Sequence, residues 1–165
     1  GSVGLLSITR RVYHRVDVQT NDVMPLTVQV RTGTRAFHNI LGFSPATTPD
    51  GRWGFLYGFG TEPRLGRNIH VNIDLTAEQV VERPEWVDAV NLVGRLGAAL
   101  GVDLGRHITL SAGPLVNVLV SDWRQDDTGA FASALPPATP PMEWRSGHTH
   151  IVGWYGWRGA LGVRF

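Results

Sequence analysis

Residues 151–165 have the sequence IVGWYGWRGALGVRF, in which alternate positions fall into two chemically different sets. A period of two indicates a β-strand with two distinct faces. One set is apolar or aromatic and consists of Ile151, Gly153, Tyr155, Trp157, Gly159, Leu161, Val163 and Phe165. The other consists of Val152, Trp154, Gly156, Arg158, Ala160, Gly162 and Arg164. The first set suits lipid, and the second suits a narrow interior of small residues with a few charges.

The same alternation recurs upstream. It is clear in residues 108–121, 67–76 and 52–60, and in the last of these large aromatic residues alternate mainly with glycine. That combination is typical of a tightly curved sheet. Pro114 is a defect in the first segment, because proline cannot donate a hydrogen bond to a strand ladder. Shorter strands are predicted at 26–33 and 36–43, and a first strand at 4–18.

Residues 86–104 fit either a strand or a helix. Thr76 and Gln79 could form a helix capping box, and Pro84 could start the helix. Glycines stand at 94, 97, 101 and 105, and each would cost a helix about 1 kcal/mol relative to alanine. We therefore expect a strand.

These segments predict an all-β, antiparallel, up-and-down transmembrane β-barrel of about eight strands, with residues 1–165 forming a single domain. The even number of strands puts both termini of the chain at the same end of the barrel. Short turns at that side and longer connections opposite are typical of bacterial outer-membrane barrels. Turns are predicted near 33–35, 62–67 and 103–106, and longer connections at 19–23, 44–51, 76–88 and 122–147. The last connection should tolerate deletion of 130–140.

Composition excludes several classes of function. The formal net charge of +1 gives no basic field for nucleic acid. Without cysteine there is no disulfide, thiolate nucleophile or thiolate metal site. No apolar run of about 18 residues predicts a transmembrane helix.

The terminal strand resembles the C-terminal assembly signal of Gram-negative outer-membrane proteins, an alternating apolar strand that ends in Phe. The residues that carry this resemblance are Tyr155, Trp157, Leu161, Val163 and Phe165. Residues 3–17 are similar to the short Gly/Leu-rich surface repeats that precede some bacterial barrel segments. The resemblances imply the bacterial outer membrane as location and the lipid bilayer and the barrel assembly machinery as partners. They imply no catalytic residues.

Four charged residues occupy inward-facing positions of the predicted strands and form the candidate interior network. They are Arg31, Asp74, Arg95 and Arg158. An eight-stranded barrel is filled by its own side chains, so these charges must pair with one another. In particular, Arg95 and Arg158 should lie near Asp74. A ligand site or proton path is the alternative interpretation.

Other polar residues support weaker hypotheses. His148 and His150 could share a metal ion, but no third ligand is identifiable. Ser121 or Ser146 could act with one of these histidines and Asp122 as a hydrolase. We expect neither a metal nor another cofactor, and no enzyme activity.

The expected function is that of a membrane anchor or a scaffold that displays the longer connections, with any extracellular ligand of those connections unknown. Two alternatives remain. One is a soluble lipocalin-like barrel that binds a small apolar ligand, and the other is an outer-membrane lipid-modifying enzyme.

Overall fold

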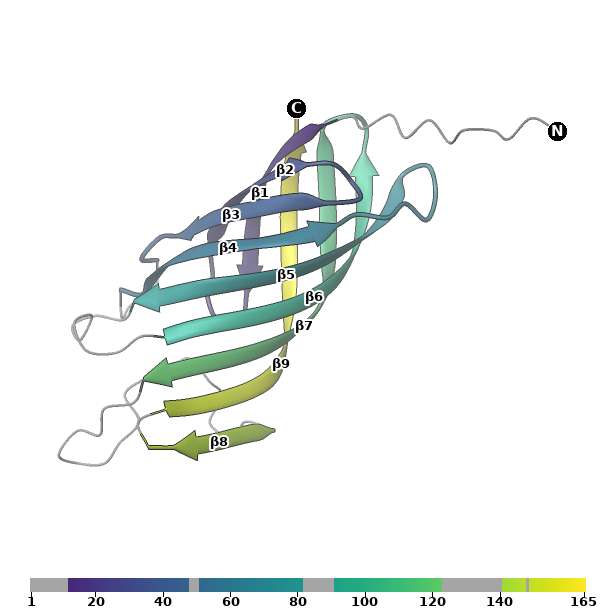
Figure 1. Ribbon diagram of the computed structural model, residues 1–165. Helices are drawn as coiled ribbons and strands as arrows, with labels where there is room; N and C mark the ends of the chain where they lie inside the picture. The colour runs from purple at the N-terminus through teal and green to yellow at the C-terminus, as the bar shows by residue number, and fades with distance from the viewer. Residues whose placement is uncertain (1–11, 48–50, 82–90, 123–140, 148) are drawn as a thin grey trace.

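The computed structural model describes residues 12–47, 51–81, 91–122, 141–147 and 149–165, which form strands and turns (Figure 1). No helix long and apolar enough to cross a membrane occurs in these residues. The strands are β1 (Tyr13–Asn21), β2 (Thr27–Gly33), β3 (His38–Ser44), β4 (Trp53–Thr61), β5 (Ile69–Val81), β6 (Asn91–Leu104), β7 (Ile108–Asp122), β8 (Met142–Ser146) and β9 (Thr149–Arg164). The all-β prediction is confirmed.

The strands close into a barrel. From β1 to β7 each strand pairs antiparallel with the next, and β7 pairs with β9. β9 in turn pairs with β1, from Arg15 opposite Arg164 to Asn21 opposite Arg158. Eight strands therefore form the closed, up-and-down, antiparallel barrel that the sequence predicts. The turns β2–β3, β4–β5 and β6–β7 lie at the end where the chain finishes, which we call the turn end (Figure 1). The opposite end is the loop end.

Several predicted boundaries change. β5 continues to Val81 and includes Thr76 and Gln79, so these residues belong to a strand and form no capping box. β6 is a strand throughout Asn91–Leu104, which confirms the strand interpretation there. β8 lies inside the predicted connection 122–147 and pairs with β9. Residues 3–11 of the proposed surface repeat and the proposed deletion 130–140 lie outside the described residues, while residues 13–17 of the repeat lie in β1.

In the described part of the chain, the pairing of β9 on the side away from β7 is divided between β1 and β8. Pairing with β1 ends at Arg158, and pairing with β8 begins at Gly153. Among the described strands, residues 154–157 therefore have a neighbour only on the β7 side. A second irregularity lies at Pro114, where the β6–β7 register has no partners between Gly97–Leu115 and Leu100–Ala112. This gap is the ladder defect expected from proline.

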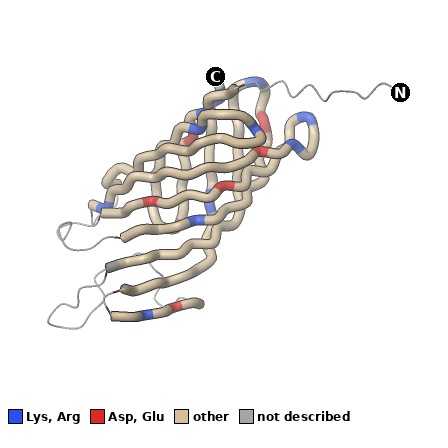
Figure 2. The backbone as a smooth tube through the Cα atoms, viewed as in Figure 1, with Lys and Arg blue, Asp and Glu red and all other residues tan. Residues whose placement is uncertain are grey.

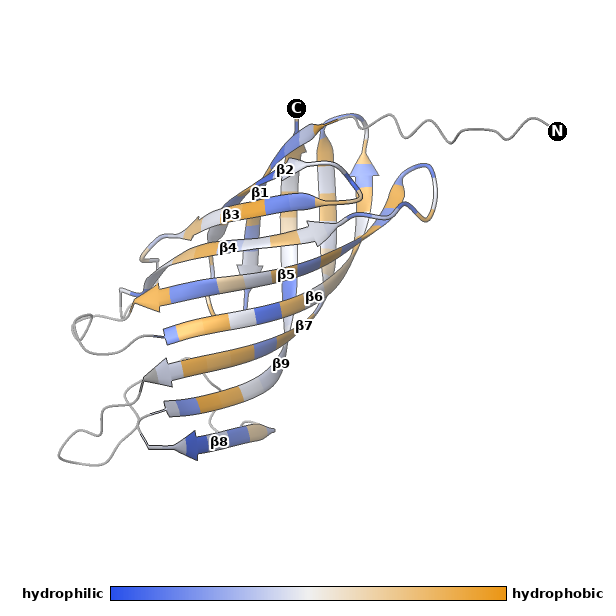
Figure 3. Ribbon diagram, viewed as in Figure 1, coloured by the Kyte–Doolittle hydropathy of each residue, from blue (hydrophilic) through white to orange (hydrophobic). Residues whose placement is uncertain are grey.

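The two faces of the wall differ in chemistry (Figure 3). Outward positions on the eight barrel strands carry no Asp, Glu, Lys or Arg among the side chains that the structure describes. Large apolar side chains are exposed there instead, and we call them the apolar belt. The belt consists of Val18, Val28, Val30, Leu41, Phe43, Phe55, Tyr57, Phe59, Ile69, Ile73, Leu75, Leu96, Leu100, Val102, Leu104, Ile108, Leu110, Val116, Val120, Tyr155, Trp157, Leu161 and Val163.

Candidate functional site: the charged barrel interior

Asp74 is the centre of the interior network. Its two carboxylate oxygens accept hydrogen bonds from Nη1 and Nη2 of Arg31, at 2.7 and 2.8 Å. Nη1 of Arg158 donates to Oδ2 of the same carboxylate at 2.5 Å. All three side chains are buried, and they come from β5, β2 and β9. The structure thus brings together three of the four residues selected from the sequence.

A second carboxylate, Asp17 on β1, extends the network. Nε of Arg31 donates to Asp17 Oδ2 at 2.5 Å, and Nε of Arg15 lies 2.8 Å from Asp17 Oδ1. Gln29 donates to Asp17 Oδ2 at 3.2 Å. The positive and negative charges therefore alternate through the interior, which is how buried charges avoid the cost of isolation.

Arg95 is inside the barrel, but its partner is Glu78 rather than Asp74. Its Nη1 donates to Glu78 Oε2 at 2.5 Å, and the Ser44 hydroxyl donates to the other oxygen. Arg95 therefore lies inside the barrel beside the same interior space as Asp74, as predicted, but its ion pair is with Glu78. The sequence pattern ended β5 at Thr76, whereas the strand continues and brings Glu78 into the inward phase two residues later.

A third cluster closes the turn end, and sequence reasoning missed it. Glu62 accepts a hydrogen bond from Arg15 at 2.6 Å and one from Arg164 at 3.2 Å. Arg164 also donates to Asp103 at 3.2 Å. The alternation of β9 already placed Arg164 in the inward set, and that of β1 could have indicated Arg15. Glu62 belongs to a turn, where no periodicity shows that its side chain is fully buried. Figure 2 shows the acidic and basic positions along the tube.

Inward glycines provide the space for these charged side chains. A Cβ atom on Gly60 would lie 2.1 Å from Asp74 Oδ1 and 2.8 Å from His38 Nε2. One on Gly101 would lie 2.1 Å from His70 Nε2, and one on Gly162 would lie 2.2 Å from Asp17 Oδ1. The inward glycines, which the sequence predicted from the curvature of the sheet, therefore have a second role. They leave room for the large polar side chains Asp74, His70 and Asp17, each of which faces a glycine.

Little room remains at the centre of the barrel. The space beside Asp74, Arg95 and Arg158 has a cavity volume of about 0 Å³, so it does not hold even a water molecule. Ligand pockets usually measure about 300–1,000 Å³. The geometry fits an ion-pair core that holds the strands together better than it fits a ligand site.

The loop end of the interior is apolar instead. Val23 and Met24, from the β1–β2 turn, are buried among side chains of four strands. Those side chains are Val80, Val93, Leu119, Val152 and Trp154. The adjacent Asp22 is exposed and accepts hydrogen bonds from Trp154 Nε1 at 2.5 Å and Asn117 Nδ2 at 3.1 Å. This turn therefore plugs the barrel above the charge network.

The proposed hydrolase residues do not form a triad in the described part of the chain. Ser121 and His150 are cross-strand neighbours, but the Ser121 hydroxyl donates to Asn91 Oδ1 at 2.7 Å. Nε2 of His150 lies 2.8 Å from Glu143 Oε1. Ser146 is exposed on β8, while His148 and the Asp122 side chain lie outside the description. The described residues include no cluster of three or more His, Asp or Glu that could hold a metal ion.

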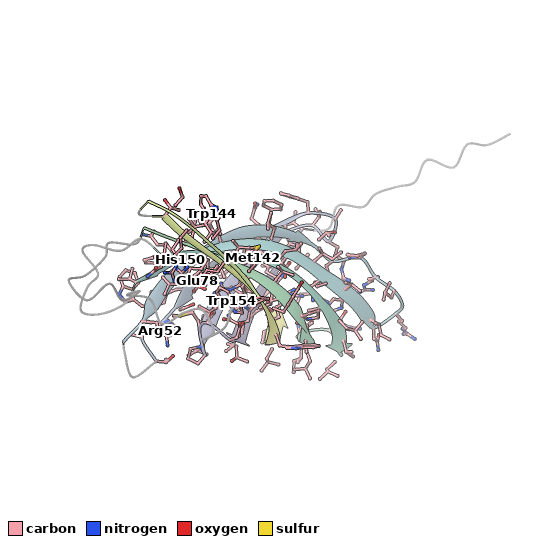
Figure 4. The ribbon with its side chains drawn as sticks, turned by 90° about the horizontal axis from the view of Figure 1, so that it is seen from below. Arg52, Glu78, Met142, Trp144, His150 and Trp154 are labelled. Atoms are coloured by element: carbon pink, nitrogen blue, oxygen red, sulfur yellow. The ribbon has the colours of Figure 1, made fainter. Side chains whose placement is uncertain are left out.

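β8 forms a short arm at the loop end, outside the eight barrel strands. Glu143 lies on the same side of the sheet as His150, and Trp144 lies on the opposite side and is exposed (Figure 4). Hydrogen bonds from His150 and then from Arg145 lower the pKa of the Glu143 carboxyl. The arm therefore presents an apolar outer face and an ion-paired inner face.

No family model, curated protein or solved structure matches this chain. The fold and the interior alone define its class. It is a closed eight-stranded antiparallel barrel with paired charges inside and apolar side chains outside.

Proposed function

We propose that this chain is an outer-membrane β-barrel that anchors in a lipid bilayer, presents its loop end as a scaffold and catalyses no reaction. One observation carries the proposal: acids and arginines point inward, and the described outward positions of the barrel strands carry neither. In water, an apolar belt around the whole wall would forgo about 25 cal/mol for each Å² of apolar surface left exposed. In lipid the apolar belt contacts apolar acyl chains instead of water. Closure of the barrel lets the backbone N–H and C=O groups of neighbouring strands hydrogen-bond to one another.

The distribution of connections also supports the outer membrane. The three longest connections, β3–β4, β5–β6 and β7–β8, lie at the loop end, and the turns beside the C-terminus are shorter than these. In bacterial outer-membrane barrels the short turns face the periplasm. By this orientation the turn end is periplasmic, the loop end is extracellular, and the terminal strand with Phe165 would be read by the barrel assembly machinery.

A soluble lipocalin-like barrel is the second candidate, and the interior argues against it. Such a barrel needs an apolar cavity for its ligand and a polar outer wall. Here the middle of the interior is occupied by paired Arg, Asp and Glu side chains, and the loop end is filled by Met24 and Val23. A lipid-modifying enzyme has less support still, because the hydroxyl of Ser121 donates to Asn91 rather than to a histidine.

The proposal is tested by the behaviour of the purified chain with and without a mild detergent. We expect it to need detergent for refolding and to migrate differently on a gel before and after boiling, because a closed barrel resists dodecyl sulfate until it is heated. A monodisperse, folded protein in plain buffer would contradict membrane insertion and favour the soluble barrel.

A further inference from the structure

The turns at the turn end expose arginines and bury their acids. Arg64 and Arg67 of the β4–β5 turn and Arg106 of the β6–β7 turn are exposed. The two acids nearest to them in the chain, Glu62 and Asp103, are buried and belong to the interior cluster. Figure 2 shows basic positions at the tip of the β4–β5 turn. The outer surface of these turns therefore carries positive charge and no carboxylate side chain.

The β4–β5 and β6–β7 turns lie side by side. The Asp103 N–H donates to the Asn68 carbonyl oxygen at 2.8 Å, so the pairing of β5 with β6 continues into the turns. Nη2 of Arg64 also donates to Asp103 Oδ2, at 3.3 Å. Arg67 and Arg106 therefore belong to the same sector of the turn end. Neither side chain forms a hydrogen bond or an ion pair with another described residue.

Both arginines stand just beyond the apolar belt. Ile69, two residues after Arg67, and Leu104, two residues before Arg106, are exposed belt residues at the ends of their strands. At about 3.3 Å per residue, the two arginine backbones lie at most about 7 Å beyond the belt. The headgroup layer on each side of the hydrocarbon core is about 5–8 Å thick. With the belt in the core, both guanidinium groups reach the depth of the lipid phosphates.

We propose that Arg67 and Arg106 bind the phosphate of an anionic phospholipid in the leaflet around the turn end. A guanidinium group can donate two parallel N–H···O bonds to one phosphate. A lipid whose headgroup has no cation of its own leaves that phosphate charge unpaired, so phosphatidylglycerol fits better than phosphatidylcholine. The site rests on the proposed membrane function, because only an inserted barrel brings lipid phosphates to this depth.

The described residues of the loop end have a different charge pattern. They expose two carboxylates, Asp22 and Glu143, which repel anionic lipid. The exposed Arg145 at that end is paired with Glu143 at 2.5 Å. The preference for anionic lipid should therefore belong to the turn end.

The test is native mass spectrometry of the refolded barrel titrated with phosphatidylglycerol and phosphatidylcholine of identical acyl chains, so that only the headgroup differs. Wild type should prefer phosphatidylglycerol by about tenfold or more, since each arginine near an anionic lipid surface adds several-fold. Because the attraction is electrostatic, the preference should fall as the ammonium acetate concentration rises. The double variant Arg67→Gln/Arg106→Gln should bind the two lipids equally.

Two controls separate the site from net charge and from free phosphate. Arg52→Gln/Arg145→Gln removes the same charge from the loop end and should keep the wild-type preference (Figure 4 labels Arg52 at that end). Glycerol 1-phosphate carries the phosphate without acyl chains, and at equal concentration it should not displace the bound lipid.

A wild type without preference, a preference that survives in Arg67→Gln/Arg106→Gln, or an equal loss in the loop-end control would overturn the site and leave the membrane barrel intact. Displacement by glycerol 1-phosphate at equal concentration would overturn a membrane lipid as the ligand. Failure of wild type to form a heat-modifiable barrel would overturn both proposals.

Discussion

Asp74 and Arg31 form a two-point ion pair although they lie 43 residues apart in the chain and on strands that are not neighbours. Two parallel N–H···O bonds fix the orientation of both planar groups. Because Arg158 shares the Asp74 carboxylate, one acid connects β2, β5 and β9 through the interior. The pair therefore fixes the distance between opposite parts of the wall.

Removal of this acid should destabilise the barrel strongly. Asp74→Asn leaves Arg31 and Arg158 without a shared anion, and breaking a buried pair from one side costs about 3–5 kcal/mol. Urea unfolding in a mild detergent measures this loss. In the double variant Asp74→Leu/Arg31→Met the loss should be smaller than the sum of the two single losses. Additive losses, or a cost below about 1 kcal/mol for Asp74→Asn, would mean that the pair does not hold the strands together.

The glycine opposite the ion pair should be equally sensitive. In Gly60→Ala the new methyl carbon would lie 2.1 Å from Asp74 Oδ1 and 2.8 Å from the Ile73 carbonyl oxygen, so the ion pair must shift. We expect a loss of about 1–3 kcal/mol in the same urea assay, the range for overpacking a filled core. Gly66→Ala is the matched control, because no foreign atom lies within 4 Å of its Cβ position. Equal stabilities for the two variants would show that Gly60 is not required for space.

The sequence alone was sufficient for the barrel and for part of its interior. Alternation along β9 assigned Arg158 to the interior because a two-residue period leaves no ambiguity once one face is identified. Arg95 received the wrong partner because the length of β5 depends on pairing with β6, which no local pattern reveals. The Glu62 cluster and the Met24 plug were missed for a similar reason: both come from turns whose side chains fold inward, and turns carry no periodicity.

The β8 arm should respond to acid. The pKa of Glu143 is lowered in the folded chain, so its contacts as a carboxylate with His150 and Arg145 are complete above the ordinary glutamate pKa of about 4.3 and are lost only as pH falls through the lower folded value. The Trp144 indole signal in NMR should therefore shift below pH 4.3, and the shift should vanish in Glu143→Gln. A transition at or above the ordinary value would contradict the pairing.

Deletion of Phe165 should affect assembly more than stability. Its side chain is exposed, and within the described residues its backbone N–H donates to the His14 carbonyl oxygen at 3.0 Å. We expect near-normal refolding in detergent but a several-fold lower yield in the membranes of living cells. Comparing the two yields for wild type and deletion tests this difference. Equal cellular yields would argue against a role for Phe165 as an assembly signal.

The lipid-facing belt is tested most directly by the free energy of unfolding of Leu161→Arg in lipid bilayers. Leu161 faces outward beside Leu110, and an arginine on a lipid-facing wall costs about 2–4 kcal/mol at mid-depth and less near an interface. Leu65→Arg, at an exposed apolar residue of the β4–β5 turn, is the control and should cost almost nothing. A measurable loss for Leu161→Arg alone is the predicted result. A cost below about 0.5 kcal/mol for both variants, as for ordinary surface substitutions in water, would contradict the membrane-embedded barrel.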